Sequence, residues 1–294
     1  MRYLYVCNTS SDSVSKINIE HLDEQNKIVL GDNRLTRVGP HGICIYKNNI
    51  LTANNYSNDI SVIDIKHQKK VQDYFIGMHC NDVRVQEDTA YVICGDSNNV
   101  ITFNLKKEKI MQEIPCGNLP HSIDIDKRKK IAIISNMEDD SITLMDCSNN
   151  SIMRKIKVGA YPTKALFSLN GDYIFVCESN IGLDCKGSLA IISLKNFEIL
   201  TRVRLGNSPV DMYCDERFCY VSNFGEGTIS IIDINNFKEV KAIRIGGMPR
   251  GIIRVGRMLY VGDNYNNLLF RIDIKNRNKK AISIGGEPTG MTLN

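Results

Sequence analysis

The stretch "SIIDINNFKEVKAIRIG", residues 230–246, has nearly the same pattern as an earlier stretch, "SVIDIKHQKKVQDYFIG", residues 61–77. Each contains two β-branched runs separated by a polar turn, and each ends in Gly. Versions of this sequence pattern recur along the chain at a spacing of about 40 residues, a period typical of propellers and solenoids. The chain is therefore expected to be a repeat protein.

Each repeat contains four short apolar runs. The first follows a G-x-x-P turn, the second ends like "YVxN", the third reads like "VSVID", and the fourth ends in "I-x-I-G". The runs are rich in β-branched residues and are bounded by Gly, Pro, Asn, Asp and Ser, which favours strands over helices. Each repeat is thus expected to be a four-stranded antiparallel sheet.

Two columns of equivalent residues, each with one member from every repeat, give the number of repeats. The column that opens the first run contains Pro40, Cys80, Pro120, Pro162, Pro209, Pro249 and Pro288. The column that closes the second run contains Asn8, Asn54, Cys94, Asn136, Glu178, Asn223 and Asp263. Because the second column starts before the first, the C-terminal run "TGMTL" is expected to complete the sheet begun by residues 3–30. The fold class expected is all-β, a seven-bladed β-propeller whose ring the C-terminal strand closes.

The whole chain, residues 1–294, is expected to be a single propeller domain. The repeats run approximately over 1–37 with 286–294, 38–77, 78–117, 118–159, 160–206, 207–246 and 247–285.

The segments "YVCNTSSDSVSKINI", "TANNYSNDISVIDI" and "YVSNFGEGTISIIDI" resemble the repeat of the YVTN-type β-propeller family. The resemblance extends over nearly the whole chain and implies the propeller fold. Propellers of seven blades bind ligands, scaffold partners or carry catalysis, so the fold leaves the activity open.

Composition sets few limits on function. The net charge is +4, hydrophobic residues make up 43% and charged residues 24%, which is ordinary for a globular protein. The chain opens without an apolar run of signal-peptide length, so a cytoplasmic location is expected. Ten cysteines are present without any C-x-x-C pair, and free structural thiols are expected. No cofactor is expected.

The residues after the Pro column are chemically varied, and loops at this end of a blade often carry ligand sites. We call this end the top of a blade, and the predicted site is at the top mouth of the channel. Its predicted ligand-binding residues are His41, Asn81, Asp82, His121, Lys164, Asp211 and Arg250. The alternative is that these residues cap loops and bond neighbouring blades.

A metal site is a weaker hypothesis. His41, His79 and His121 lie at or beside the same column of three consecutive repeats, with Cys80 and Cys116 in the same loops. Imidazole and thiolate together suit zinc or copper. The alternative is that each imidazole bonds a backbone carbonyl.

Two insertions, residues 31–42 and 178–188, lengthen loops expected at the top, and such insertions often mark a binding face. The opposite, bottom turns are basic and could attract an anionic surface, although solvated turns are the alternative. The basic residues are Lys66, Lys69, Lys70, Lys106, Lys107, Lys109, Lys127, Arg128, Lys129 and Lys130. The Asn column and the Asp of "VID" are interpreted as structural.

The sequence contains no nucleophile elbow, Walker loop or dinucleotide fingerprint. This favours a non-enzymatic binding or scaffold propeller that recognises a protein, peptide or small ligand at the top face. The alternatives are a lactonase-like hydrolase or streptogramin-lyase-like enzyme with its site at the top of the channel, or a metal-binding propeller. The lyase repeat normally carries Trp, which this chain lacks. Aromatic residues are not interleaved with the basic ones, so nucleic acid is not an expected partner.

Overall fold

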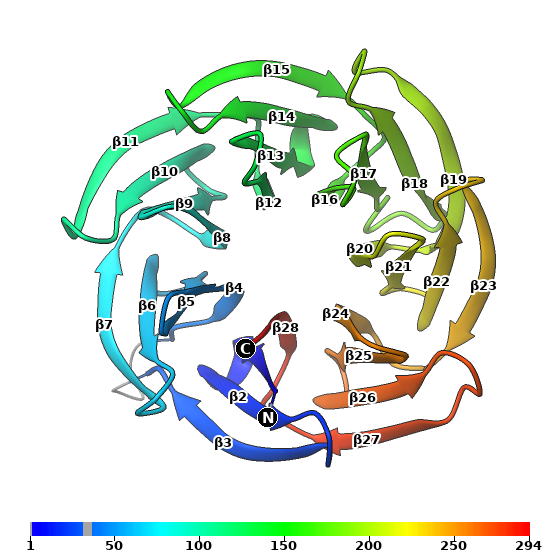
Figure 1. Ribbon diagram of the computed structural model, residues 1–294, viewed down its shortest axis with the longest axis horizontal. Coiled ribbons are helices and arrows are strands. Elements are labelled where there is room, and N and C mark those ends of the chain that lie inside the picture. The colour runs from blue at the N-terminus through cyan, green and yellow to red at the C-terminus, as the bar shows by residue number, and fades with distance from the viewer. Residues whose placement is uncertain (1, 32–36) are drawn as a thin grey trace. The chain divides into compact units, whose positions relative to one another are not determined.

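The computed structural model describes residues 2–31 and 37–294 of the chain. The fold is all-β, with seven four-stranded blades in a ring that the C-terminal strand closes (Figure 1). This confirms the fold class predicted from the two residue columns. No helix in the described part of the chain has the length and apolar character needed to cross a membrane.

Within each blade the strands follow one another in the order of the sequence, except in blade one. Blade one contains β28 (Pro288–Leu293), β1 (Tyr3–Asn8), β2 (Ser13–Asn18) and β3 (Asp23–Val29). Blade two contains β4 (Pro40–Tyr46), β5 (Asn49–Asn54), β6 (Asp59–Asp64) and β7 (Lys69–Phe75). Blade three contains β8 (Cys80–Gln86), β9 (Thr89–Cys94), β10 (Asn99–Asn104) and β11 (Lys109–Pro115).

The remaining four blades repeat the same pattern. Blade four contains β12 (Pro120–Asp126), β13 (Ile131–Asn136), β14 (Ser141–Asp146) and β15 (Ser151–Lys157). Blade five contains β16 (Pro162–Phe167), β17 (Tyr173–Glu178), β18 (Lys186–Ser193) and β19 (Ile199–Asn207). Blade six contains β20 (Pro209–Cys214), β21 (Phe218–Asn223), β22 (Thr228–Asp233) and β23 (Lys238–Arg244). Blade seven contains β24 (Pro249–Val255), β25 (Met258–Asp263), β26 (Leu268–Asp273) and β27 (Lys279–Ser283).

Two short 3-10 helices, η1 (Thr9–Ser11) and η2 (Met137–Asp139), follow the second strands of blades one and four. The chain divides into two compact units. Unit 1 contains residues 1–113 and 253–294, and unit 2 contains residues 114–252. The assignment of the whole chain to a single domain stays a prediction.

Blade one joins the two ends of the chain within unit 1. Strand β28 pairs antiparallel with β1, and Leu4 lies opposite Leu293. Two backbone hydrogen bonds between Tyr3 and Asn294, of 3.2 and 3.0 Å, extend this ladder to the last residue. The predicted closure is confirmed, and it leaves β1 as an interior strand with partners on both sides.

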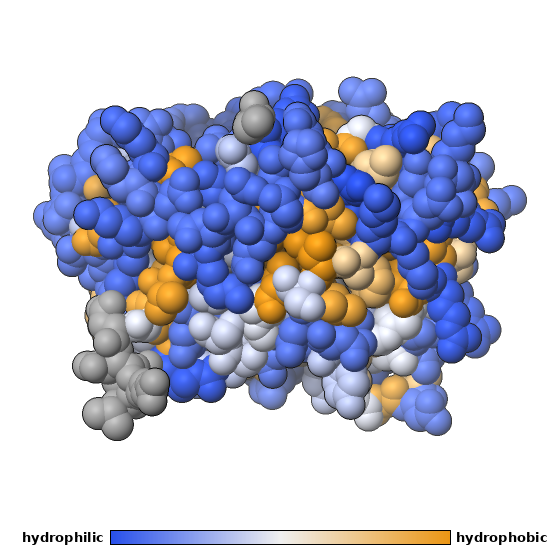
Figure 2. All heavy atoms as spheres, turned by 90° about the horizontal axis from the view of Figure 1, so that it is seen from below, coloured by the Kyte–Doolittle hydropathy of each residue, from blue (hydrophilic) through white to orange (hydrophobic). Residues whose placement is uncertain are grey.

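The second strand of each blade is its most buried element. All seven second strands show the same pattern, in which the first residue is partly buried and the next five are buried. Their two faces pack into cores between blades, as where Leu51 of blade two shares a cluster with Val92 and Ile101 of blade three. The outermost strands are covered on one face only, so that Phe75 on β7 is 67% exposed. Figure 2 shows such apolar side chains among a majority of hydrophilic ones.

A buried amide ties the top of most blades together. Asn136 at the end of β13 donates to Ser141 Oγ at 3.0 Å and to Thr143 Oγ1 at 2.9 Å, both on β14. Its Oδ1 accepts the N–H of Gly117, at 3.1 Å, from the loop that leads into the blade. Asn8 and Asn223 make the equivalent pairs of bonds to hydroxyls of their third strands. These contacts support the structural role predicted for this column at Asn8, Asn136 and Asn223, whose partners are side-chain hydroxyls and, for Asn136, also a backbone N–H.

At Gly117 and Gly285, the Gly that ends the repeat is explained by the same amide. A Cβ built on Gly117 would lie 2.5 Å from Cγ of Asn136, and one on Gly285 would lie 2.4 Å from Cγ of Asn8. Real Cβ atoms do not approach this closely, so only Gly leaves room for the amide of the following blade. The Asp of "VID" caps the turn after the third strand, as where Asp64 accepts from the N–H of His67 at 2.7 Å.

One disulfide corrects the prediction that all cysteines are free. Cys214 and Cys219 lie directly opposite each other on β20 and β21, with their Cα atoms 4.1 Å apart, and they are bonded. Only a short turn separates them, so the register of the hairpin brings the two side chains together. The other cysteines of the chain are free thiols, and four of them, Cys7, Cys80, Cys94 and Cys177, are buried.

Deleting residues 286–294 removes β28 and leaves β1 as an exposed edge. We expect the free energy of unfolding to fall by several kcal/mol, because a whole strand of ladder bonds and apolar contacts is lost. Urea denaturation of both proteins measures the loss, and a synthetic 286–294 peptide added in trans should restore part of it. A truncated protein as stable as the full chain would contradict the closure.

Replacing Asn136 by Ala leaves two hydroxyls and one buried N–H without their partner. We expect the free energy of unfolding to fall by about 2 kcal/mol. The matched control is Asn48→Ala in the exposed turn between β4 and β5, which should change stability little. Equal stabilities of the two variants would show that the amide tie is dispensable.

Candidate functional site

A pocket opens at the top of unit 2, beside the first strands of blades four to seven. Its empty space, open solvent included, is about 280 Å³. Its lining residues are His121, Met137, Thr163, Ile181, Val210, Phe224 and Arg250. Four of them come from the column after Pro, and three come from loops that follow a second strand. The pocket is therefore built where the propeller repeat allows variation without disturbing the sheets.

Two pocket residues also fasten neighbouring blades. His121 Nδ1 lies 2.7 Å from the carbonyl oxygen of Thr163 in the next blade. Since a carbonyl only accepts, Nδ1 carries the proton in this contact. Thr163 in turn donates its hydroxyl to the carbonyl oxygen of Pro209, at 3.0 Å. The column after Pro thus forms a chain of side-chain bonds from blade four to blade six.

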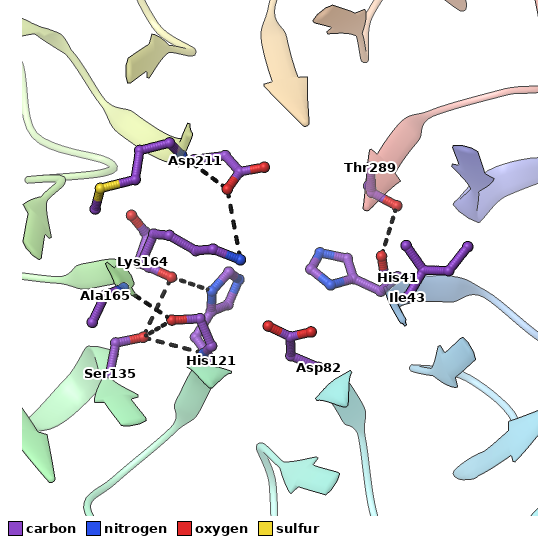
Figure 3. A network of polar contacts seen from close by, with 12 residues as sticks. His41, Ile43, Asp82, His121, Ser135, Lys164, Ala165, Asp211 and Thr289 are labelled. Carbon is purple, nitrogen blue, oxygen red and sulfur yellow. Dashed lines mark hydrogen bonds and ion pairs between the residues drawn. The ribbon is translucent and has the colours of Figure 1, made fainter. Parts of the chain in front are cut away.

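A second chain of contacts lies directly behind His121 (Figure 3). The hydroxyls of Ser122 and Ser135 are 2.7 Å apart, and Ser122 Oγ accepts the N–H of Ala165 at 3.2 Å. Ser135 Oγ donates to the same carbonyl, of Thr163, that faces His121, at 3.3 Å. The imidazole is therefore held against a network that joins blades four and five.

Lys164 and Asp211 form an ion pair on adjacent blades of unit 2. The Nζ to Oδ1 distance is 3.7 Å, and the two side chains are 15% and 19% exposed. Asp211 also accepts the N–H of Met212 at 2.9 Å. Cys177 lies opposite Lys164 in the blade, and burial raises the pKa of its thiol, an effect to which Asp211 adds.

The predicted residues of unit 1 form a separate group. His41 Nδ1 lies 2.9 Å from the carbonyl oxygen of Asn81, which repeats the fastening made by His121. Thr289 donates toward the carbonyl oxygen of His41 at 3.3 Å. Asp82 is buried and pairs with Arg84 at 2.8 Å. Figure 3 shows His41 and Asp82 projecting from β4 and β8.

Close backbone contact explains why two positions of unit 1 carry Gly. A Cβ on Gly42 would lie 2.5 Å from Cα of Asp82, and one on Gly290 would lie 2.3 Å from the carbonyl oxygen of His41. First strands of adjacent blades therefore approach within backbone contact here. The same column accepts Lys164 and Asp211 in unit 2.

The two predicted insertions differ in the contacts that the structure gives them. Residues 32–36 of the first insertion lie outside the described residues. Its last part is fastened to blade one, where Asp12 Oδ1 accepts the N–H groups of Val38 and Gly39 at 3.0 and 2.8 Å. The second insertion starts at Glu178, which accepts from Arg202 at 2.9 Å and from the N–H of Gly159 at 2.7 Å. This insertion also brings Ile181 to the pocket.

Each histidine of the metal hypothesis contacts another group of the chain. His41 and His121 face backbone carbonyls, and His79 Nδ1 lies 3.1 Å from Asp96. Among residues 2–31 and 37–294, no group of three or more His, Cys, Asp or Glu side chains is arranged to hold a metal ion.

Several basic residues of the bottom turns form ion pairs or hydrogen bonds within the chain. In unit 1, Lys70 pairs with Asp73 and Lys106 pairs with Asp88, each at 2.6 Å. In unit 2, Arg128 donates to the carbonyl of Leu169 at 3.0 Å and Lys129 to that of Gly171 at 2.6 Å. An anionic partner for these turns stays a prediction.

Sequence analysis predicted His121 and Arg250 but not the apolar half of the pocket. Met137 and Phe224 directly follow the Asn column, a position that is Thr9, Asn55, Gly95, Ser179 and Asn264 in the other repeats. Large apolar side chains at a polar loop position were the available signal. Ile181 had no such signal, because an insertion has no counterpart in the other repeats.

No protein-family model matches the chain, and no curated protein matches it in sequence. Among solved structures, it is similar to a functionally unknown protein from Desulfotomaculum acetoxidans, with a TM-score of 0.84 and 16% identity over 99% of this chain and 98% of that one. Hydrazine synthase from Kuenenia stuttgartiensis has a TM-score of 0.74 and 16% identity, over 96% and 92%. AztD from Citrobacter koseri has a TM-score of 0.67 and 12% identity, over 100% and 98%. At such identities these similarities show the β-propeller fold alone.

Replacing Thr163 by Val removes one hydroxyl at nearly constant volume. The carbonyl of Pro209 loses its side-chain donor, and we expect the free energy of unfolding to fall by about 1 kcal/mol. Thr201→Val on the outer strand β19 is the control and should be close to neutral. Thermal denaturation compares the two, and equal melting temperatures would contradict a fastening role for Thr163.

Proposed function

We propose that the chain is a non-enzymatic binding propeller whose ligand occupies the pocket of unit 2. The strongest support is that several residues that depart from the repeat lie together around this pocket. Met137, Phe224 and Ile181 replace or add to polar loop residues, and all three line the pocket. Structural loop residues would not need large apolar side chains at a solvent-facing end.

The lining favours a ligand with an apolar body and a carboxylate. Met137, Ile181, Val210 and Phe224 supply an apolar wall, and Arg250 supplies a guanidinium, which matches a carboxylate through two parallel donors. Small-ligand sites commonly combine an apolar lining with a few polar groups that fix orientation. A short carboxylic acid or the C-terminal residue of a peptide has both parts.

A binding role fits the polar groups better than acid–base catalysis does. The one imidazole of the pocket is held through Nδ1 by a backbone carbonyl. Lys164 and Asp211 are paired with each other at 3.7 Å. A catalytic base generally needs a partner that orients and activates it toward substrate.

The segments "YVCN" and "YVSN" support a further proposal, that the chain is a divergent YVTN-type repeat protein. In this interpretation the Asn of the repeat is the residue that ties strands two and three. The blades that depart from it, with Cys94 and Glu178, have kept the fold through other contacts.

Benzoate tests the ligand class because it combines a small apolar ring with a carboxylate. We expect NMR titration to shift resonances of the pocket residues, and benzylamine and benzyl alcohol to bind at least roughly tenfold more weakly. Arg250→Gln should weaken benzoate binding by roughly tenfold, since a charge-assisted contact is lost.

The control for this titration is Arg204→Gln, on the exposed face of the outer strand β19. It should leave benzoate binding unchanged. Equal binding of the three probes, or equal loss in both variants, would contradict a carboxylate-selective pocket. Benzoate shifts confined to the bottom turns would place the ligand elsewhere.

A further inference from the structure

Blade three departs from the repeat at two positions that face each other. At the top of five other blades, the first residue of the first strand pairs with the last residue of the second strand. These pairs are Pro40 with Asn54, Pro120 with Asn136, Pro162 with Glu178, Pro209 with Asn223, and Pro288 with Asn8. Blade three has Cys80 opposite Cys94 in this register. Both columns thus change to Cys in the same blade.

The amide tie is missing from blade three as a consequence. In the blades that carry Asn in this column, the Asn donates to side chains five and seven positions later, as Asn136 does to Ser141 and Thr143. The corresponding residues after Cys94 are Asn99 and Ile101. Ile101 has no polar atom on its side chain, and Oδ1 of Asn99 is buried without a hydrogen-bond partner. The top of blade three therefore lacks a covalent or polar equivalent of the tie.

The thiols of Cys80 and Cys94 are close enough to form a covalent tie in place of the amide. Their sulfur atoms are 4.0 Å apart, and both residues are fully buried. Directly opposed residues of an antiparallel pair have Cα atoms roughly 4.5–5.5 Å apart, which is within the range of disulfides. Cys214 and Cys219 have the same opposed register on blade six, and they are bonded.

We propose that Cys80 and Cys94 are an oxidation site, where hydrogen peroxide converts the two thiols to a disulfide that staples the first two strands of blade three. One sulfur attacks a peroxide oxygen, which breaks the O–O bond and releases water while a sulfenic acid forms. The second sulfur then attacks the sulfenic sulfur and releases a second water. Two thiols are oxidised by two electrons, and one peroxide is reduced to two waters.

The surroundings suit a slow, lasting bond rather than a fast sensor. Cys80 Sγ donates to the carbonyl oxygen of Gly77 at 3.2 Å, and a Cβ on Gly77 would lie 3.0 Å from Sγ of Cys94. The loop before β8 therefore covers the pair, and only a small neutral oxidant is expected to reach it. The neighbouring Cys94 thiol, together with burial, raises the pKa of Cys80 far above its ordinary value, which slows the reaction.

Peptide mapping tests the proposal directly on the intact chain. The protein is reduced, freed of reductant, exposed to hydrogen peroxide and then unfolded in N-ethylmaleimide. Trypsin cuts after Arg84, so that Cys80 and Cys94 fall in separate peptides, residues 71–84 and 85–106. We expect these peptides to be linked, with the loss of two hydrogens. Peptides that stay unlinked, labelled or separately over-oxidised would overturn the proposal.

Melting measures the stapling effect. Closing a loop of this length should raise the melting temperature of the oxidised protein by roughly 5 °C. Both variants are made in a Cys219→Ala background, so that re-formation of the Cys214–Cys219 bond does not contribute. Cys80→Ala should lose this rise, whereas Cys7→Ala, which removes a buried free thiol of blade one, should keep it. A linked protein whose melting temperature does not change would contradict the staple. Mapping of the natural chain decides the matter even if Cys80→Ala fails to fold.

Discussion

The amide at the end of the second strand is the contact that holds the top of each blade that carries Asn in this column. Asn136 joins the loop that leads into its blade, the second strand and the third strand through bonds of 3.1, 3.0 and 2.9 Å. A buried amide left without these partners would be costly, so one residue fixes three segments at once. The Gly at 117 and the hydroxyls of Ser141 and Thr143 are explained by its position.

A top end fixed in this way leaves the neighbouring loop positions free to vary. The column after Pro is used for fastening where it carries His121 and Thr163, whose side chains reach carbonyls of the next blade. Val210 and Arg250 of the same column line the pocket, as His121 and Thr163 also do. The fastening interpretation therefore holds for His121 and Thr163, and ligand binding by the column stays a proposal.

The sequence was sufficient for the fold because its columns are set by contacts within one blade, which recur in each repeat. The site was only half predictable. His121 and Arg250 were found from their column, but Ile181 belongs to an insertion without internal counterparts. The Cys214–Cys219 bond was missed because the number of residues in the turn, and hence the register, decides whether two strand cysteines face each other. Asp82 and Asp211 share a column yet pair differently, with Arg84 and Lys164, because their neighbours differ.

The central functional claim is that the varied loops of blades four to six, with Arg250 of blade seven, form one carboxylate-binding pocket. A crystal structure of the chain grown with benzoate tests this most directly. The account predicts density for the ring between Met137 and Phe224, with the carboxylate facing the guanidinium of Arg250. A pocket that stays empty at saturating benzoate, with ligand density at the bottom turns or beside His41 in unit 1, would contradict it.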